Sequence, residues 1–327
     1  MLFDNHGRPL SYLRLAVTDR CNLRCFYCMP AEGVRYLPKK QVLSFEEMER
    51  LVRVLAGLGI RKVRITGGEP FVRHDLMQFL RKLRAIDDLH EIAITTNGVL
   101  TEPYLPELKA LGVRSVNLSL DTLDPERFLK ITRRDEFAAV RRTLDALLAQ
   151  EFEVKINAVV MDGQNTDDLH PLAELTRRHP VAVRFIEEMP FNGEGSHYPT
   201  LTWNYRRILD ELRRFYPNLE KLPDPAHSTA ATYRVPGYAG DLGIIAAFSR
   251  TFCGTCNRIR LTAQGELKTC LYQHGGLQLR DRLREGISDE GLTELLLEAF
   301  QNRPRDGFEA ERLRPVEVRE SMTTIGG

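Results

Sequence analysis

The chain has 327 residues, of which 43% are hydrophobic, so it can bury one large core or one core with a smaller appended unit. Its 46 Lys and Arg residues are balanced by 45 Asp and Glu residues, which argues against a nucleic acid polymer as partner. No apolar run reaches the roughly 18 residues of a membrane span and the N-terminal sequence lacks a secretion pattern, so we expect a soluble, cytoplasmic protein with no membrane partner.

Strand and helix patterns alternate along the first 187 residues. The predicted strands are 14–17, 62–66, 91–96, 114–120, 153–160 and 181–187. Helices are predicted from Ser44, where Glu47 completes a capping box, and over 75–83, 102–111, 136–150 and 167–178. This alternation predicts an α/β fold with a parallel sheet and helices outside it. Six units are too few for an eight-stranded barrel, so we predict an open, partial (β/α)6 barrel, with a doubly wound sheet as the alternative.

The pattern changes near residue 190. A helix is predicted over 201–215, short strands near 231–235, 243–248 and 258–262, and helices at about 277–285 and 289–302. We therefore divide the chain into a barrel domain, 1–190, and a smaller α+β extension, 191–327. The chain ends in TTIGG, which from composition alone suggests a frayed terminus.

The six cysteines fall into two groups of three. Cys21, Cys25 and Cys28 follow the first strand with the spacing C-x3-C-x2-C, and Cys253, Cys256 and Cys270 have the spacing C-x2-C-x13-C. An odd number of thiols cannot be closed by local disulfides, and clustered thiols in a reducing compartment indicate metal binding. Structural zinc needs four closed ligands, whereas three thiolates suit a cubane iron–sulfur cluster with one open iron. His274 leaves a Cys3His zinc site open as the alternative for the second group.

Two further patterns lie on the predicted barrel. The sequence TGGEP begins where the second strand ends. Basic residues alternate with apolar ones on several strands, as in Lys62 and Arg64 or Arg258 and Arg260, so each pair shares a face. Cations converging from such strands suit a polyanion such as a triphosphate. The chain has no G-x-x-x-x-G-K-[ST] loop, so side chains rather than a phosphate loop would hold a nucleotide.

CNLRCFYC followed by TGGEP resembles the radical S-adenosylmethionine (SAM) superfamily. A finer resemblance, to the GTP 3′,8-cyclase family of molybdenum cofactor biosynthesis, spans nearly the whole chain. It is carried by DRCNLRCFYCMPAEG (19–33), RITGGEP (64–70), TTNG (95–98), NLSLD (117–121), RFIEEMP (184–190), FCGTCNRIRLT (252–262), CL (270–271) and the terminal Gly-Gly.

The resemblance implies a radical SAM GTP 3′,8-cyclase, a lyase that converts GTP to 3′,8-cyclo-7,8-dihydro-GTP. A 5′-deoxyadenosyl radical would take hydrogen from ribose C3′, and the sugar would close on guanine C8. The implied cofactors are SAM and two [4Fe–4S] clusters. The implied partners are GTP, a second copy of the chain in a homodimer, a transient reductant protein, and cyclic pyranopterin monophosphate synthase as recipient of the product.

The resemblance also implies site residues. The metal ligands would be Cys21, Cys25 and Cys28 for one cluster, and Cys253, Cys256 and Cys270 for the other. SAM would contact Tyr27, Gly68, Ser119 and Met189. GTP would contact Arg14, Arg64, Thr95, Lys155, Arg184, Arg258, Ile259 and Arg260. The catalytic set would be Arg14 with Gly326 and Gly327, the two glycines reaching into the active site because they carry no side chain.

Two positions depart from the family pattern: Tyr198 stands where tryptophan is often found, and Arg133 where glycine is common. Three rival functions remain. Another radical SAM enzyme, modifying a peptide or tetrapyrrole, usually carries more C-terminal cysteines. An electron carrier closes each cubane with a fourth protein ligand. A zinc-stapled nucleotide-binding protein would contain zinc instead of iron.

Overall fold

The computed structural model describes residues 2–191, 201–314 and 320–326. Its strands within these residues are β1 (Tyr12–Ala16), β2 (Lys62–Thr66), β3 (Glu91–Thr96), β4 (Ser115–Ser119), β5 (Glu153–Val160), β6 (Ala182–Glu187), β7 (Glu220–Lys221), β8 (Ala230–Arg234), β9 (Asp241–Ile245), β10 (Arg258–Leu261), β11 (Glu266–Lys268) and β12 (Leu277–Gln278). They form one sheet in the order β12-β11-β10-β1-β2-β3-β4-β5-β6-β9-β8-β7.

The first six strands are parallel and each lies beside the next along the chain. This sequential order excludes the doubly wound alternative, in which the strand order reverses, and confirms the partial barrel. The strands after residue 190 belong to the same sheet as the first six. β10 pairs in parallel with β1, β9 pairs in parallel with β6, and antiparallel strands continue to both open edges. The boundary at residue 190 itself stays a prediction.

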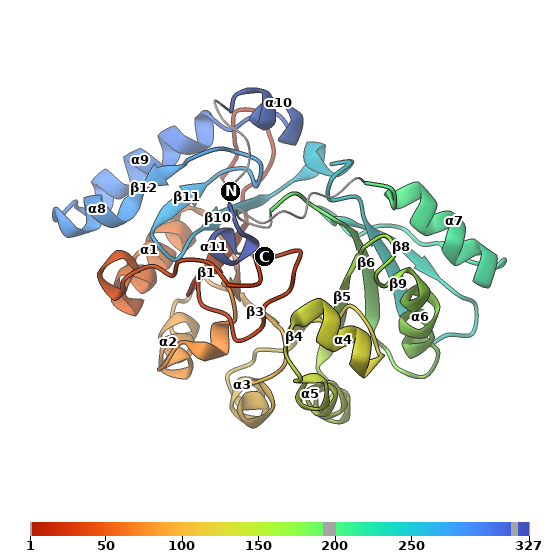
Figure 1. The fold of residues 1–327 in the computed structure, drawn as a ribbon. Helices are drawn as coiled ribbons and strands as arrows, with labels where there is room; N and C mark the ends of the chain where they lie inside the picture. The colour runs from red at the N-terminus through yellow and green to blue at the C-terminus, as the bar shows by residue number, and fades with distance from the viewer. Residues whose placement is uncertain (1, 192–200, 315–319, 327) are drawn as a thin grey trace.

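Helices cover the convex side of the curved sheet (Figure 1). The helices that follow the first five strands are α1 (Phe45–Leu58), α2 (Leu76–Arg84), α3 (Leu105–Ala110), α4 (Pro125–Thr132), α5 (Phe137–Ala149) and α6 (Leu169–Arg178). The later helices are α7 (Tyr205–Phe215), α8 (Leu279–Arg284), α9 (Asp289–Gln301), α10 (Gly307–Arg312) and α11 (Met322–Ile325). Short 3-10 turns are η1 (Lys39–Gln41), η2 (Pro70–Val72), η3 (Glu102–Tyr104), η4 (Thr166–Asp168) and η5 (Cys253–Thr255).

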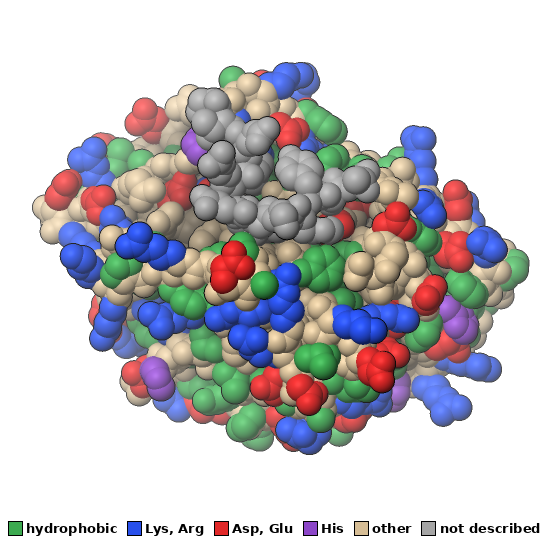
Figure 2. Space-filling view, viewed as in Figure 1, with side chains coloured by type: hydrophobic (Ala, Val, Ile, Leu, Met, Phe, Trp, Pro, Cys, Tyr) green, Lys and Arg blue, Asp and Glu red, His purple; other side chains and the backbone are tan. Residues whose placement is uncertain are grey.

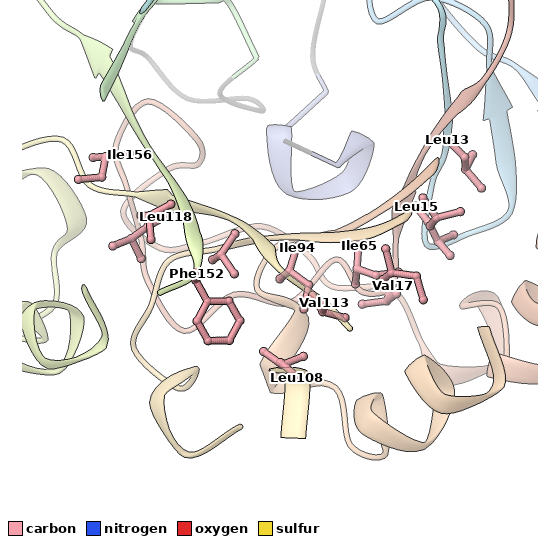
Figure 3. Close-up of a cluster of buried hydrophobic side chains, with 14 of the residues drawn as sticks. Leu13, Leu15, Val17, Ile65, Ile94, Leu108, Val113, Leu118, Phe152 and Ile156 are labelled. Carbon is pink, nitrogen blue, oxygen red and sulfur yellow. The ribbon is translucent and has the colours of Figure 1, made fainter. Parts of the chain in front are cut away.

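The main core lies between the sheet and these helices, where buried leucine, isoleucine and valine side chains from neighbouring strands pack together (Figure 3). On β1, Leu13 and Leu15 are fully buried in this core. Because side chains alternate along a strand, Arg14 points to the opposite, concave face. The predicted capping box begins α1, with Ser44 Oγ accepting from the Glu47 amide at 3.1 Å and Glu47 Oε2 accepting from the Ser44 amide at 2.6 Å.

The sequence patterns missed several short elements, namely α4, β7, β11, β12, α10 and α11. The expectation of a frayed terminus was wrong for 321–326. α11 lies on the concave side of the sheet near the C-terminus (Figure 1), and Gly326 is buried.

Acidic and basic side chains are interspersed over the face in Figure 2, as the balanced composition implies. No helix in the described ranges is long and apolar enough to cross a membrane.

Candidate active site

The first cysteine loop leaves the end of β1 and is tied to the end of α4. The amides of Arg24 and Phe26 donate to the carbonyls of Thr132 and Ile131 at 2.9 and 3.1 Å. Arg133 ends α4 in the left-handed conformation, with φ of 56°, which explains why glycine suits this position. Its guanidinium donates to the carbonyls of Arg24 at 3.2 Å and Met29 at 3.1 Å. Arg133 therefore stabilises the loop by a side chain that glycine lacks.

The two glycines of TGGEP make room for this same loop. A Cβ atom on Gly67 would lie 2.4 Å from the Thr18 carbonyl oxygen, and one on Gly68 would lie 2.3 Å from that of Arg20. The Gly68 and Glu69 amides donate to these two carbonyls at 2.8 Å each. The close approach is thus made by the backbone of the cysteine loop. Contact between Gly68 and SAM stays a prediction.

Acidic groups surround the first three thiols. Burial, reinforced by Cys28, Asp121 and Cys21, raises the pKa of Cys25 well above its usual value. Burial and then Glu69 raise the pKa of Cys21 to about 11. Asp121 accepts a hydrogen bond from the Tyr27 hydroxyl at 2.8 Å, and burial raises the pKa of Asp121 to about 6. The neighbourhood therefore disfavours thiolates unless positive charge is bound there.

The second cysteine loop has the opposite surroundings. Cys256 Sγ accepts hydrogen bonds from Arg303 Nη2 at 3.2 Å and Arg258 Nη2 at 3.4 Å. Burial would raise the pKa of Cys256, but the charges of Arg258 and Arg303 lower it to about 6. Burial raises the pKa values of Cys253 and Cys270. The surroundings of Cys256 therefore favour its negatively charged thiolate form.

Each donor set consists of three free thiols, which suits an iron–sulfur cluster. Within each group the thiols influence one another's pKa, as expected for neighbouring sulfurs. Among the described residues, no set of three or more His, Cys, Asp or Glu side chains is arranged to hold one metal ion. The Cys3His zinc alternative for the second group stays open. Cubane clusters spread their cysteine ligands over several irons and suit sets made only of thiolates.

A cavity of about 750 Å³ lies on the concave face, between the two cysteine loops. Cys28 from the first loop and Cys253, Cys256 and Cys270 from the second line it. The strand register places Arg14 of β1 between Arg64 of β2 and Arg260 of β10. The cationic residues lining the cavity from the strands are Arg14, Lys62, Arg64, Lys155, Arg184, Arg258, Arg260 and Lys268.

Most of these cations have no acidic partner. In the described part of the chain, Lys62 pairs with Glu91 and Lys268 with Glu320, but Arg14, Arg64, Lys155, Arg184, Arg258 and Arg260 form no ion pair. Arg14 Nε is buried without a hydrogen-bond partner. Burial, and then repulsion from Arg184, lowers the pKa of Lys155 to about 8, and burial and then Arg64 lower that of Arg184 to about 10. Buried cations without partners are costly, so the cavity favours a polyanionic ligand.

The structure brings together most of the site residues predicted from the sequence. Tyr27, Ser119 and Met189 line the cavity, as do the predicted GTP contacts except Ile259. The Ile259 side chain is fully buried in the main core, so only its backbone is left to contact a ligand. The Gly326 carbonyl accepts a hydrogen bond from Arg260 Nη1. A side chain at this position would be crowded, because a Cβ atom on Gly326 would lie 3.1 Å from the Ala16 Cβ. Gly327 and Tyr198 lie outside the described residues.

The sequence patterns missed Tyr12, Asn117 and Arg303. Tyr12 and Asn117 share their strand faces with Arg14 and Ser119, so the period of two could have indicated them. Arg64 Nε donates a hydrogen bond to the Tyr12 hydroxyl oxygen at 2.5 Å. Burial would raise the pKa of Tyr12, but the charges of Arg64, Arg14 and Lys62 lower it to about 7. No local pattern marks Arg303, because its partners Asp4, Cys256 and Thr269 are all distant in the sequence.

Comparison with known proteins gives consistent results. Residues 15–176 match the radical SAM superfamily, and residues 181–308 match the family described as Molybdenum Cofactor Synthesis C. The chain is 42% identical to the GTP 3′,8-cyclase of Heliobacterium modesticaldum, covering 93% of each chain. It is 39% identical to the GTP 3′,8-cyclase of Chlorobaculum tepidum, covering 100% of this chain and 97% of the relative.

Longer relatives and a solved structure also match. The chain is 42% identical to molybdenum cofactor biosynthesis protein 1 of Drosophila melanogaster, covering 94% of this chain and 55% of that protein. It spans about half the length of such animal relatives. The crystal structure of Streptococcus suis SuiB has a TM-score of 0.61 at 14% identity, covering 94% of this chain and 69% of that one. At this identity the match shows the fold alone.

Proposed function

Because this chain belongs to the GTP 3′,8-cyclase family of the radical SAM superfamily, we propose that it cyclises GTP in the biosynthesis of the molybdenum cofactor. One observation supports this most strongly. Six cations that form no ion pair within the described residues line a single cavity together with cysteines of both groups. Arg64 and Arg260 are buried, whereas Arg14, Lys155, Arg184 and Arg258 are partly buried. That arrangement suits a triphosphate held between two metal centres.

The two cysteine groups would hold the two [4Fe–4S] clusters of the family, and the first would also bind SAM. When bound, that cluster and SAM supply a one-electron cleavage that generates a hydrogen-abstracting radical. Tyr27, Gly68, Ser119 and Met189 would orient SAM. The hydrogen bond from Tyr27 to Asp121 fixes the Tyr27 ring at the rim of this site.

The cations would bind and orient GTP. Arg14, Arg64, Arg258 and Arg260 come from adjacent strands and would hold the triphosphate, with Lys155 and Arg184 from the facing strands. Thr95 Oγ1 is buried, has no hydrogen-bond partner among residues 2–191, 201–314 and 320–326, and would be free to bond the substrate. Arg260 also bonds the Gly326 carbonyl, so the C-terminal glycines would lie against the bound nucleotide. The tail and the surrounding walls would keep water away from the reacting atoms.

The remaining partners are proposed from the family alone. They are a homodimer, a transient reductant protein, and cyclic pyranopterin monophosphate synthase as recipient of the product. We also propose a cytoplasmic location. Peptide or tetrapyrrole modification is the rival, and the unpaired cations favour the nucleotide.

The decisive experiment is anaerobic incubation of the reconstituted protein with SAM, GTP and dithionite. We expect a cyclised nucleotide and 5′-deoxyadenosine by mass spectrometry, and about eight irons per chain, four for each cubane. ATP in place of GTP is the control, because it carries the same triphosphate on a different base. Stoichiometric zinc, or 5′-deoxyadenosine without any change in GTP, would contradict the proposal.

A further inference from the structure

The N-terminal segment contacts the second cysteine loop through three buried charged side chains. Asp4, Arg8 and Arg303 are at most 6% exposed, although Asp4 and Arg303 are 299 residues apart. Asp4 Oδ2 accepts from Arg8 Nε at 2.7 Å and from Arg303 Nη1 at 3.1 Å. Two guanidinium groups therefore share one carboxylate inside the protein.

This cluster of three carries one excess positive charge, and a cysteine sulfur lies within hydrogen-bond distance of it. Arg303 Nη2 lies 3.2 Å from Cys256 Sγ. A buried charge without a partner is costly, so the pairing is most favourable when Cys256 is a ligand thiolate. Arg258 also donates to this sulfur, and both side chains line the cavity. Arg303 is buried and paired with Asp4, whereas Arg258 is partly exposed and forms no ion pair within the described residues, so it is available to a ligand.

Arg303 also fixes the backbone on both sides of the second cysteine group. Its Nη1 donates to the Cys256 carbonyl and its Nη2 to the Arg258 carbonyl, both at 2.9 Å. Its Nε donates to the carbonyl of Thr269, the residue before Cys270, at 2.9 Å. Arg8 Nη1 adds a bond to the Cys253 carbonyl at 3.2 Å. One planar guanidinium thus sets the position of the Cys253–Cys256 turn relative to Cys270.

We propose that Arg303, oriented by Asp4 and Arg8, is the positioning residue of the second cluster and raises its reduction potential. This inference rests on the proposed function, because it takes the second cysteine group to hold a [4Fe–4S] cluster. Hydrogen bonds to a ligating sulfur and nearby positive charge both make a cluster easier to reduce. In the described part of the chain no guanidinium bonds a sulfur of the first group, so the effect is confined to the second cluster.

The test compares Arg303→Gln and Arg303→Lys with Arg305→Gln in the full-length, reconstituted protein. Arg305 is a matched control, because its side chain is 70% exposed and its one ion pair within the described residues is with Asp306. Iron per chain and the midpoint potential of each cluster are measured by redox titration followed by electron paramagnetic resonance. Adding SAM identifies the paramagnetic resonance signal of the first cluster, and adding GTP identifies the signal of the second.

For Arg303→Gln we expect a more negative potential for the second cluster, or loss of its four irons alone, with the first cluster unchanged. Arg303→Lys keeps the charge but not the planar fork, so we expect a smaller shift in potential. Arg305→Gln should match the parent protein in both measurements.

Unchanged potential and iron in Arg303→Gln would overturn the inference, as would equal loss of both clusters, which indicates a general folding defect. These outcomes differ from failure of the proposed function. In that case the parent protein itself would lack eight irons or form no cyclised nucleotide.

Discussion

The two cysteine groups have the same number of thiols but opposite electrostatic surroundings. The first lies beside Asp121 and Glu69, and no guanidinium bonds its sulfurs in the described residues. The second lies under Arg258 and Arg303, which bond the sulfur of Cys256. The difference teaches that the cysteine spacing indicates the kind of metal centre, whereas the charged side chains around it indicate which small molecule can bind there. A site rich in carboxyl groups suits the cationic SAM, and a site rich in guanidinium groups suits an anionic nucleotide.

The substitution Cys25→Ser should distinguish the roles of the two cysteine groups most clearly. It removes one ligand of the first cluster only, so we expect 5′-deoxyadenosine formation to fall to background while GTP affinity stays within about twofold of the parent, below 0.5 kcal/mol. Chromatography and anaerobic calorimetry measure the two. If 5′-deoxyadenosine persists, the first group is not where SAM is cleaved.

Gly68→Ala tests the backbone packing that holds the first group alone. The new Cβ would lie 2.3 Å from the Arg20 carbonyl oxygen, so the cysteine loop has to move. We expect about 3 kcal/mol of lost stability by chemical denaturation, and a loss of iron confined to the first cluster.

Gly57→Ala in α1 is the matched control for this substitution. Its Cβ meets nothing within 4 Å, so alanine should be neutral or stabilise by up to about 1 kcal/mol. A Gly68→Ala protein as stable and as rich in iron as Gly57→Ala would show that the loop does not need this glycine.

Arg260→Ala tests the basic side of the comparison. Arg260 is buried, forms no ion pair among the described residues, and does not bond a cysteine sulfur. Losing one charge-assisted contact of about 1.5 to 3 kcal/mol should weaken GTP binding roughly 10- to 100-fold, with iron unchanged. Arg282→Ala is the control, since its side chain is 58% exposed and pairs with Glu285. Equal GTP affinity in the two variants, by calorimetry, would exclude Arg260 from the nucleotide site.

The smallest effect is spectroscopic and concerns Tyr12. Its pKa is lowered to about 7, so its phenol should ionise near neutral pH, whereas the ordinary tyrosine value is 10. Between these values the folded state loses the proton first, so the contribution of Tyr12 to stability rises as pH rises from about 7 to 10. Tyrosinate absorbance near 295 nm should show one early step that Tyr12→Phe lacks. GTP should move this step to higher pH, because its phosphates offset the surrounding cations.

Local patterns in the sequence predicted the first six strands, all their helices except α4, and the inward-facing Arg64 and Lys155, since alternation and capping depend on neighbouring residues. They could not give contacts made across the chain. The pairing of β10 with β1 joins Arg260 to Arg14, and no composition rule foresees it. Arg303 was missed for the same reason, because its carboxylate partner is Asp4. α11 was missed because four residues are too few for a periodic pattern.

The parallel pairing of β1 with β10 also sets an order of assembly for the nascent chain. Tyr12–Leu15 must wait for residues 258–261 to be synthesised before one edge of β1 is covered. Such distant pairing is slow to form, and an uncovered strand edge can pair with other chains. The ribosome therefore releases the first cysteine loop long before the neighbouring strand arrives, and this interval is when an unfinished chain is most exposed to aggregation.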